Sequence, residues 1–116
     1  MYGSCDWKRR IVAVDYDDTI SHNDTAWLSV LLALENIGYQ VIIVTYRKPD
    51  CCPEDLDFLV KKGYKVYYTS QLGKRMFMKD FYGIEPDIWI DDTPESILFD
   101  YSTYKGEFDV DKERVK

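Results

Sequence analysis

The chain has 116 residues, of which 46% are hydrophobic and 16% aromatic, and this composition favours one packed domain over a disordered segment. A formal net charge of −6 disfavours broad binding to nucleic acid or to an anionic membrane, so we expect no extended nucleic-acid footprint. No apolar run reaches the roughly 20 residues that cross a bilayer, and the first ten residues lack the order of a secretory signal.

Hydrophobic periodicity predicts an alternation of strands and helices. Residues 11–14 are an aliphatic, β-branched run, which is typical of a strand buried on both faces. Residues 24–37 carry apolar side chains at helical spacing, with Asn23 or Asp24 to cap the start and Gly38 to end the helix. The rest of the pattern predicts a strand at 39–45, a helix that begins at Pro53 and ends just before Gly63, a strand at 65–70, a helix at 71–83, a strand at 87–92 and a short helix at 94–98.

This alternation predicts the α/β class. We expect one domain over residues 1–116 with a three-layer, Rossmann-like parallel sheet and helices on both faces. Residues 99–116 are highly charged and form either a frayed tail or an edge element. In sheets of this kind the functional site lies beyond the carboxyl ends of the strands.

Acidic residues follow two of the predicted strands. Asp15 and Asp17 follow the first strand and, being two residues apart in an extended segment, point to the same side. Asp91 and Asp92 end the fourth strand and join them if the two strands are neighbours. Grouped carboxylates are hard oxygen ligands suited to Mg²⁺. The alternative is that these aspartates only cap helices and form turns, but a second acidic pair at a buried strand end argues against it.

Three segments resemble the motifs of the haloacid dehalogenase-like superfamily of phosphohydrolases. "DYDDT" at 15–19 matches its D-x-D-x-T signature, "IIVTYR" at 42–47 is similar to its second motif, and "IWIDD" at 88–92 is similar to its fourth. The resemblance covers roughly residues 11 to 98. It implies a Mg²⁺-dependent phosphomonoester hydrolase that acts through an aspartyl-phosphate intermediate on a phosphorylated substrate, which is a nucleotide, a polynucleotide end, a sugar phosphate or a phosphoprotein.

The resemblance also implies roles for individual residues. Asp15 is the expected nucleophile, and Asp17 the acid that protonates the leaving alcohol and the base that then activates water. Mg²⁺ is held by Asp15, the backbone carbonyl of Asp17 and Asp91, with Asp92 as a ligand through water. Thr19 supports the first loop and is a candidate substrate contact.

Four further residues have two interpretations each. Thr45 either hydrogen-bonds the phosphoryl group or caps the next turn, and Arg47 either reaches the substrate phosphate or is an ordinary surface arginine. The lysine that balances phosphoryl charge is Lys74 or Lys79. These two are about 140° apart around a helix, so only one can face the site, and we favour Lys74 because Ser70 is a plausible cap that places it in the first turn.

The signature leaves no room for an inserted cap domain, since only residues 20–23 separate it from the next helix. An uncapped site is open, so it accepts a large substrate or is closed by a neighbouring subunit. His22 either faces solvent or touches substrate. The three cysteines, among them Cys51 and Cys52, do not suggest a disulfide framework, and reduced thiols in a cytoplasmic protein are the simpler expectation.

Two classes of function therefore remain open. One is the phosphatase, and the other is a non-catalytic or regulatory module that keeps the phosphate and metal site. A phosphate-accepting receiver domain is related to the second class, but receiver domains carry their acidic pair at the first strand and the phosphorylated aspartate on a later one.

Overall fold

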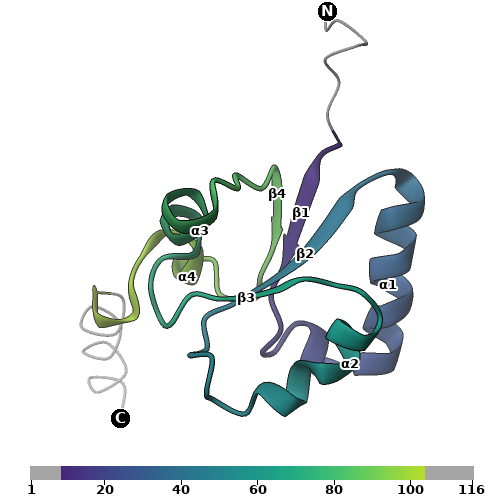
Figure 1. Ribbon diagram of the computed structural model, residues 1–116, viewed down its shortest axis with the longest axis horizontal. Coiled ribbons are helices and arrows are strands. Elements are labelled where there is room, and N and C mark those ends of the chain that lie inside the picture. The colour runs from purple at the N-terminus through teal and green to yellow at the C-terminus, as the bar shows by residue number, and fades with distance from the viewer. Residues whose placement is uncertain (1–8, 104–116) are drawn as a thin grey trace, which may run out of the picture.

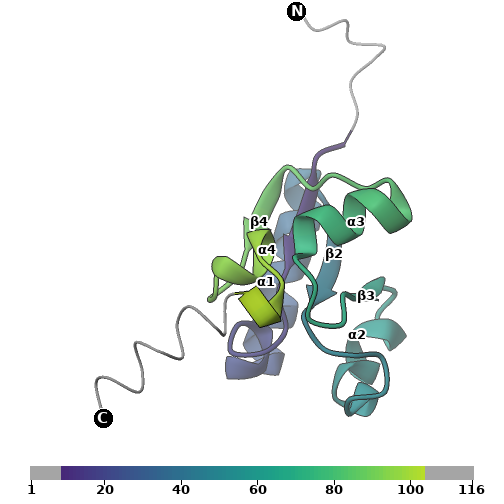
Figure 2. The same ribbon diagram turned by 90° about the vertical axis from the view of Figure 1, so that its left-hand side faces the viewer.

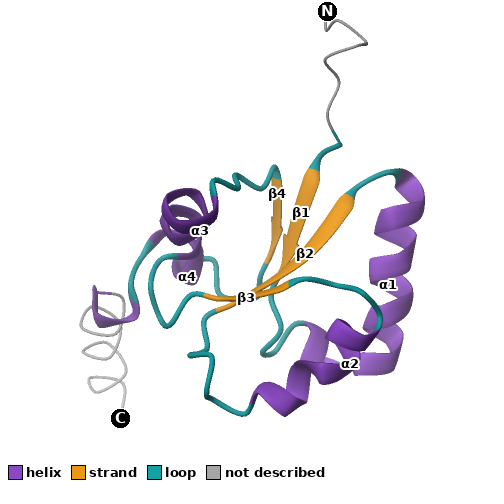
Figure 3. Cartoon of the chain, in the orientation of Figure 1, coloured by secondary structure: helices purple, strands orange, loops and turns teal. Residues whose placement is uncertain are grey.

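The computed structural model of the protein describes residues 9–103 (Figure 1). Four strands form one parallel sheet in the order β3-β2-β1-β4 (Figure 3). Their bounds are Ile11–Val14 for β1, Gln40–Thr45 for β2, Val66–Tyr68 for β3 and Ile88–Ile90 for β4. The α/β class and the four parallel strands expected from the sequence are confirmed.

Helices connect the strands and lie on both sides of the sheet. Their bounds are Asp24–Ile37 for α1, Asp57–Lys61 for α2, Lys74–Tyr82 for α3 and Glu95–Leu98 for α4, with short 3-10 turns η2 at Ile20–His22 and η3 at Pro53–Leu56. Helices α1 and α2 lie on one side, and α3 and α4 on the other (Figures 1 and 2). No helix within residues 9–103 combines the length and the apolar character needed to cross a membrane.

Helix α1 is bounded by the signals in its sequence. Of the two candidate caps, Asn23 serves at the start, because its side-chain oxygen accepts a hydrogen bond from the backbone N–H of Ala26 at 3.0 Å. At the other end Gly38 has φ +119°, a left-handed conformation that glycine adopts without steric cost.

Strand β1 lies between β2 and β4, and this position sets the geometry of the site. Val14 pairs with Ile43 of β2 and with Ile90 of β4. The backbone N–H of Asp15 continues the ladder by donating to the carbonyl of Ile90 at 2.9 Å. The carboxyl ends of β1 and β4 therefore lie side by side, as the acidic pairs in the sequence required.

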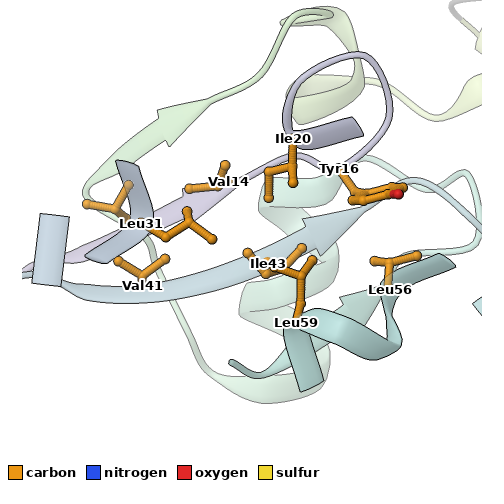
Figure 4. Packing of buried hydrophobic residues seen from close by; sticks show 9 residues of the cluster. Val14, Tyr16, Ile20, Leu31, Val41, Ile43, Leu56 and Leu59 are labelled. Carbon is orange, nitrogen blue, oxygen red and sulfur yellow. The ribbon is translucent and has the colours of Figure 1, made fainter. Parts of the chain in front are cut away.

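Alternate residues of the central strands fill two hydrophobic clusters. Val12, Val14 and Ile43 face α1 and α2, where Leu31 and Leu59 are fully buried (Figure 4). Ala13, Ile42 and Val44 pack with Met78 of α3 in the second cluster. Burying a leucine contributes roughly 1.5–3 kcal/mol, so these clusters fix the strands that carry the site. The four aromatic residues Trp27, Phe58, Phe77 and Trp89 pack against the two clusters.

The expected boundaries around β3 and α3 need correction. Strand β3 ends at Tyr68 rather than at residue 70, and α3 begins at Lys74 rather than at residue 71. Ser70 and Gln71 have positive φ values of 55° and 67°, so the chain makes a turn there. Ser70 does not cap α3, because the N-cap of this helix is Gly73.

The end of the described chain packs against the turn that precedes α3. Residues 99–103 follow α4, and the N–H of Tyr101 donates to the carbonyl of Gln71 at 2.7 Å. This part of the segment expected as a charged tail or edge element is thus a short ordered stretch that adds no strand. Residues 104–116 lie outside the described residues.

Candidate functional site

Three carboxylates meet at the carboxyl ends of β1 and β4. Asp15 directly follows β1, and Asp91 and Asp92 directly follow β4. Each offers an oxygen atom within 4.8 Å of the others. The side chains of Asp15 and Asp91 are 7% and 2% exposed, whereas Asp92 is an exposed residue, so the group opens to solvent on one side. Such a cluster of oxygen ligands has the composition of a hard-cation site.

Lys74 supplies the positive charge within this cluster. Its side chain is 1% exposed, and Nζ lies 2.8 Å from Asp15 Oδ1 and 2.5 Å from Asp91 Oδ2. As the first residue of α3, it is held where the helix starts beside the strand ends. Lys79 is exposed in the last turn of the same helix. Of the two candidate lysines, Lys74 is the one brought to the acidic cluster.

Burial dominates the electrostatics of Asp15. It raises the pKa of this carboxyl from 3.8 to about 7, the Lys74 ammonium opposes the rise, and the negative charge of Asp91 adds to it. The Lys74 ammonium pairs with two of the three carboxylates, so the group carries two formal negative charges when all three acids are ionised. A divalent cation bound here would balance this charge and favour the ionised form of Asp15.

Hydroxyl and backbone groups orient the acids. Thr19 Oγ1 lies 3.3 Å from Asp15 Oδ2 and 3.3 Å from Asp92 Oδ1, which fits the supporting role expected for it. The N–H of Thr93 donates to Asp91 Oδ1 at 2.9 Å, and Ser96 Oγ lies 3.1 Å from Asp91 Oδ2. Sequence reasoning missed Thr93 and Ser96. Their proximity to the acidic pair in "DDTPES" was the available signal.

Asp17 stands apart from the three carboxylates. Arg47 Nε lies 2.9 Å from Asp17 Oδ2, and Nη2 lies 2.7 Å from Oδ1, so the guanidinium binds both oxygens in a fork. The third nitrogen, Nη1, lies 2.9 Å from Asp55 Oδ2 and also donates to the carbonyls of Cys51 and Cys52. Arg47 thus ties the signature loop to the loop after β2, a role that neither of its expected interpretations included.

The pairing also affects Arg47 itself. The hydrogen bonds that the Arg47 guanidinium donates to Asp17, and to a smaller extent to Asp55, raise its pKa above the ordinary value, although partial burial opposes the rise. Its Cζ atom lies 5.3 Å from the centre of the Tyr16 ring. The guanidinium is therefore a fixed positive charge beside Asp17.

Thr45 is fully buried at the end of β2. Its Oγ1 accepts a hydrogen bond from the backbone N–H of Arg47 at 3.2 Å, as the turn-capping interpretation requires. Thr45 does not line the hollow over the acidic cluster. The contact with a phosphoryl group remains a prediction.

A hollow of about 210 Å³ lies over the cluster. Its lining residues come from the loops after β1, β2 and β4, from α3 and α4, and from the segment after α4; they are Asp15, Asp17, Asp18, Tyr46, Lys74, Asp91, Asp92, Thr93, Ser96 and Tyr101. Sequence reasoning missed Tyr46 and Tyr101. His22 lines another hollow, beside Asp92. Cys51 lines a third one, which adjoins the hollow over the acidic cluster.

Comparison of the chain with protein-family models, with curated proteins and with solved structures finds no match.

Proposed function

We propose that the protein is a small, uncapped, Mg²⁺-dependent phosphomonoester hydrolase with the three-layer, Rossmann-like fold of the haloacid dehalogenase-like superfamily. One observation carries the proposal: Asp15, Lys74 and Asp91 meet in a buried triad, with Asp92 beside it, at adjacent strand ends. The resemblance to the motifs of this superfamily assigns these positions to the nucleophile, the charge-balancing lysine and the metal ligands. The sequence pattern and the side-chain geometry thus point to the same chemistry.

The residues fit Mg²⁺, because oxygen atoms of three carboxylates converge and only one ammonium opposes their charge. Asp15, Asp91 and Asp92 would hold the ion, with the backbone carbonyl of Asp17 as a further candidate ligand. When bound, Mg²⁺ supplies charge neutralisation at the phosphoryl oxygens and at the three carboxylates.

In this proposal an Asp15 oxygen attacks phosphorus, a new O–P bond forms, and the bond from phosphorus to the leaving oxygen breaks. Asp17 gives a proton to that leaving oxygen and later takes one from the water that cleaves the aspartyl-phosphate. Lys74 orients Asp15 and carries positive charge next to the transferring group. The products are an alcohol and inorganic phosphate.

No second domain is inserted around the site within residues 9–103. Only η2 separates Thr19 from α1, and η3 and α2 are the only helical elements between β2 and β3. The hollow is open, which suits a phosphorylated group carried by a larger molecule, or a site that a neighbouring copy of the chain closes.

One observation favours a second candidate, a phosphate-binding and metal-binding regulatory module with little turnover. Arg47 holds both carboxylate oxygens of Asp17, the group to which the hydrolase proposal gives the proton transfers. A module of this kind needs the acidic cluster and Lys74 but not a mobile proton at Asp17.

Hydrolysis of p-nitrophenyl phosphate separates the two candidates. We expect Mg²⁺-dependent turnover by the native protein, which chelation of the metal abolishes. Asp15→Asn should lower kcat about 1,000-fold or more, and Asp17→Asn about 100- to 10,000-fold, the range for loss of a general acid–base group. Asp80→Asn on the exposed side of α3 is the matched control and should retain native turnover. Equal, negligible rates in all four proteins would favour the regulatory module.

A further inference from the structure

Hydrogen bonds hold the segment after α4, residues 99–101, at the edge of the site. Tyr46 Oη donates to the carbonyl of Phe99 at 2.7 Å, and the N–H of Tyr101 donates to the carbonyl of Gln71 at 2.7 Å. The N–H of Gly73 donates to Asp100 Oδ1 at 2.7 Å. These hydrogen bonds fix residues 99–101 against the residue that follows β2 and against the turn before α3.

These hydrogen bonds place two aromatic rings next to each other. The Tyr46 and Tyr101 rings lie with their centres 6.2 Å apart and their planes at 75°, an edge-to-face arrangement that is favourable for aromatic pairs. Both residues are half-buried, and both line the hollow over the acidic cluster. The hollow therefore has an acidic side, formed by the strand ends, and an aromatic side.

A second hollow, of about 430 Å³, adjoins the first. Both are lined by Asp17, Tyr46 and Tyr101, so these three residues form the boundary between them. The second hollow continues past this boundary to Gln71 and Lys48. A molecule that extends beyond the first hollow at this boundary has room to continue along the tyrosines.

The position of Asp17 indicates which part of a substrate would extend there. In the proposed hydrolysis Asp17 gives its proton to the leaving oxygen, so the leaving group must begin within hydrogen-bond reach of Asp17. The phosphoryl group would lie toward Asp15 and Lys74, away from this boundary. The leaving group would then pass between the acidic side and the tyrosine pair.

We propose that Tyr46 and Tyr101 form a binding site for a planar aromatic ring in the leaving group, and that the substrates are phosphomonoesters of ring-bearing alcohols. This inference rests on the proposed hydrolase function and names its substrate class. Aromatic side chains gain dispersion and quadrupolar attraction from a flat ring that a saturated or ringless group does not provide. The ring is a nucleobase or a phenyl-type group, since both present the same flat surface.

Two matched pairs of substrates test the inference. Uridine 5′-monophosphate is compared with ribose 5-phosphate, which lacks the base, and benzyl phosphate with cyclohexylmethyl phosphate, whose ring is not planar. We expect kcat/KM to favour the aromatic member of at least one pair by about 5- to 100-fold, the range measured for base stacking on an aromatic side chain. The pair with the larger ratio identifies the source of the ring.

Variants of Tyr101 connect the ratio to the proposed site. Tyr101→Leu should bring the ratio toward one, while Tyr101→Phe, which keeps the ring, should retain it. Phe81→Leu removes another exposed ring, on α3, and should leave the ratio unchanged. A ratio between two substrates of one protein is insensitive to the fraction of that protein that is folded.

Ratios near one in the native protein, together with Mg²⁺-dependent hydrolysis of all four compounds, would overturn the inference and leave the hydrolase proposal standing. A ratio that Tyr101→Leu does not change would also overturn it. No hydrolysis of any compound would refute the hydrolase proposal instead. Calorimetric binding of uridine 5′-monophosphate and ribose 5-phosphate then tests the ring site directly: equal affinities count against it, and tighter binding of the nucleotide that Tyr101→Leu abolishes supports it.

Discussion

The guanidinium of Arg47 binds the carboxylate of Asp17 through two parallel hydrogen bonds, from Nε at 2.9 Å and from Nη2 at 2.7 Å. The remaining nitrogen contacts Asp55 at 2.9 Å, so one side chain joins the signature loop to the loop after β2. A forked contact sets the direction of a carboxylate as well as its distance. In the hydrolase proposal Arg47 is therefore a positioning residue for Asp17.

The first prediction concerns this contact. Arg47→Met should lower kcat for p-nitrophenyl phosphate about tenfold or more with a smaller change in KM, because Asp17 loses its orientation while the phosphoryl site remains. Arg47→Lys restores charge without the fork and should recover only part of kcat. Steady-state kinetics at saturating Mg²⁺ measure both constants. A large rise in KM with unchanged kcat would instead assign Arg47 to substrate binding.

The second prediction concerns the buried lysine. Lys74→Met leaves Asp15 and Asp91 without their shared ammonium, so the metal-free protein should lose about 3–5 kcal/mol of unfolding free energy. Lys79→Met, on the exposed side of the same helix, should change it by less than about 0.5 kcal/mol. Urea unfolding in the presence of a chelator measures both. Similar losses in the two variants would contradict the proposed charge balance.

The third prediction follows from the pKa of Asp15, which burial raises from 3.8 to about 7. The folded state holds this proton more tightly than the unfolded state does. The stability that results is fully present below about pH 4 and is lost as the pH rises through 7. Asp15→Asn removes the titration, so the free energy of unfolding of this variant relative to the native protein should increase by about 2–3 kcal/mol between pH 5 and pH 8 without divalent cations.

Divalent cations supply the control for that experiment. Mg²⁺ favours the ionised carboxylate, so adding it at pH 8 should stabilise the native protein more than Asp15→Asn and reduce the difference between them. A difference that is independent of both pH and Mg²⁺ would show that Asp15 is not ionising at the site in this range.

The fourth prediction concerns the hydroxyl that contacts Asp91. Ser96 Oγ lies 3.1 Å from Asp91 Oδ2, and the residue is 4% exposed. Ser96→Ala should weaken Mg²⁺ binding about tenfold or more, the lower end of the range for groups that orient metal ligands. Ser29→Ala, at an exposed position of α1, is the control and should leave the affinity for Mg²⁺ unchanged. Calorimetric titration with Mg²⁺ measures both variants.

The fifth prediction tests the core that holds the strands. Leu31 is fully buried in α1, and its neighbour Leu32 is 56% exposed. Leu31→Ala should cost about 2–5 kcal/mol of unfolding free energy through lost burial and a residual cavity. Leu32→Ala should cost less than about 1 kcal/mol. Equal losses would place α1 in a different rotation about its axis.

The sequence predicted the end of β1 well, because a β-branched run followed by acids defines both where the strand ends and which residues follow it. For β4 the same pattern identified the acids at its carboxyl end, but the strand ends at Ile90 rather than at residue 92. What brings Asp15 beside Asp91 is the pairing of β1 with β4, a contact between residues distant in the chain. From the sequence alone, Asp91 was expected to join Asp15 only if the two strands were neighbours, and no local pattern shows whether they are.

Other features of the site depend on contacts without a local signal. Nothing near Arg47 in the sequence indicates that its partner is Asp17, 30 residues earlier in the chain. Tyr101 lies in a charged stretch, and it is held at the site by a hydrogen bond from its own N–H and by those of Phe99 and Asp100. Ser70 was the expected cap of α3 because serine favours that position, but its positive φ places it in the preceding turn.

The amino end of α3 is crowded as well as charged. A methyl group on Gly73 would lie 3.2 Å from the carbonyl oxygen of Leu98, and the N–H of Gly73 is bonded to Asp100. The residue that carries the buried ammonium is the next one in the chain. Shortening the protein before Asp100 would thus disturb the lysine without altering any acidic ligand.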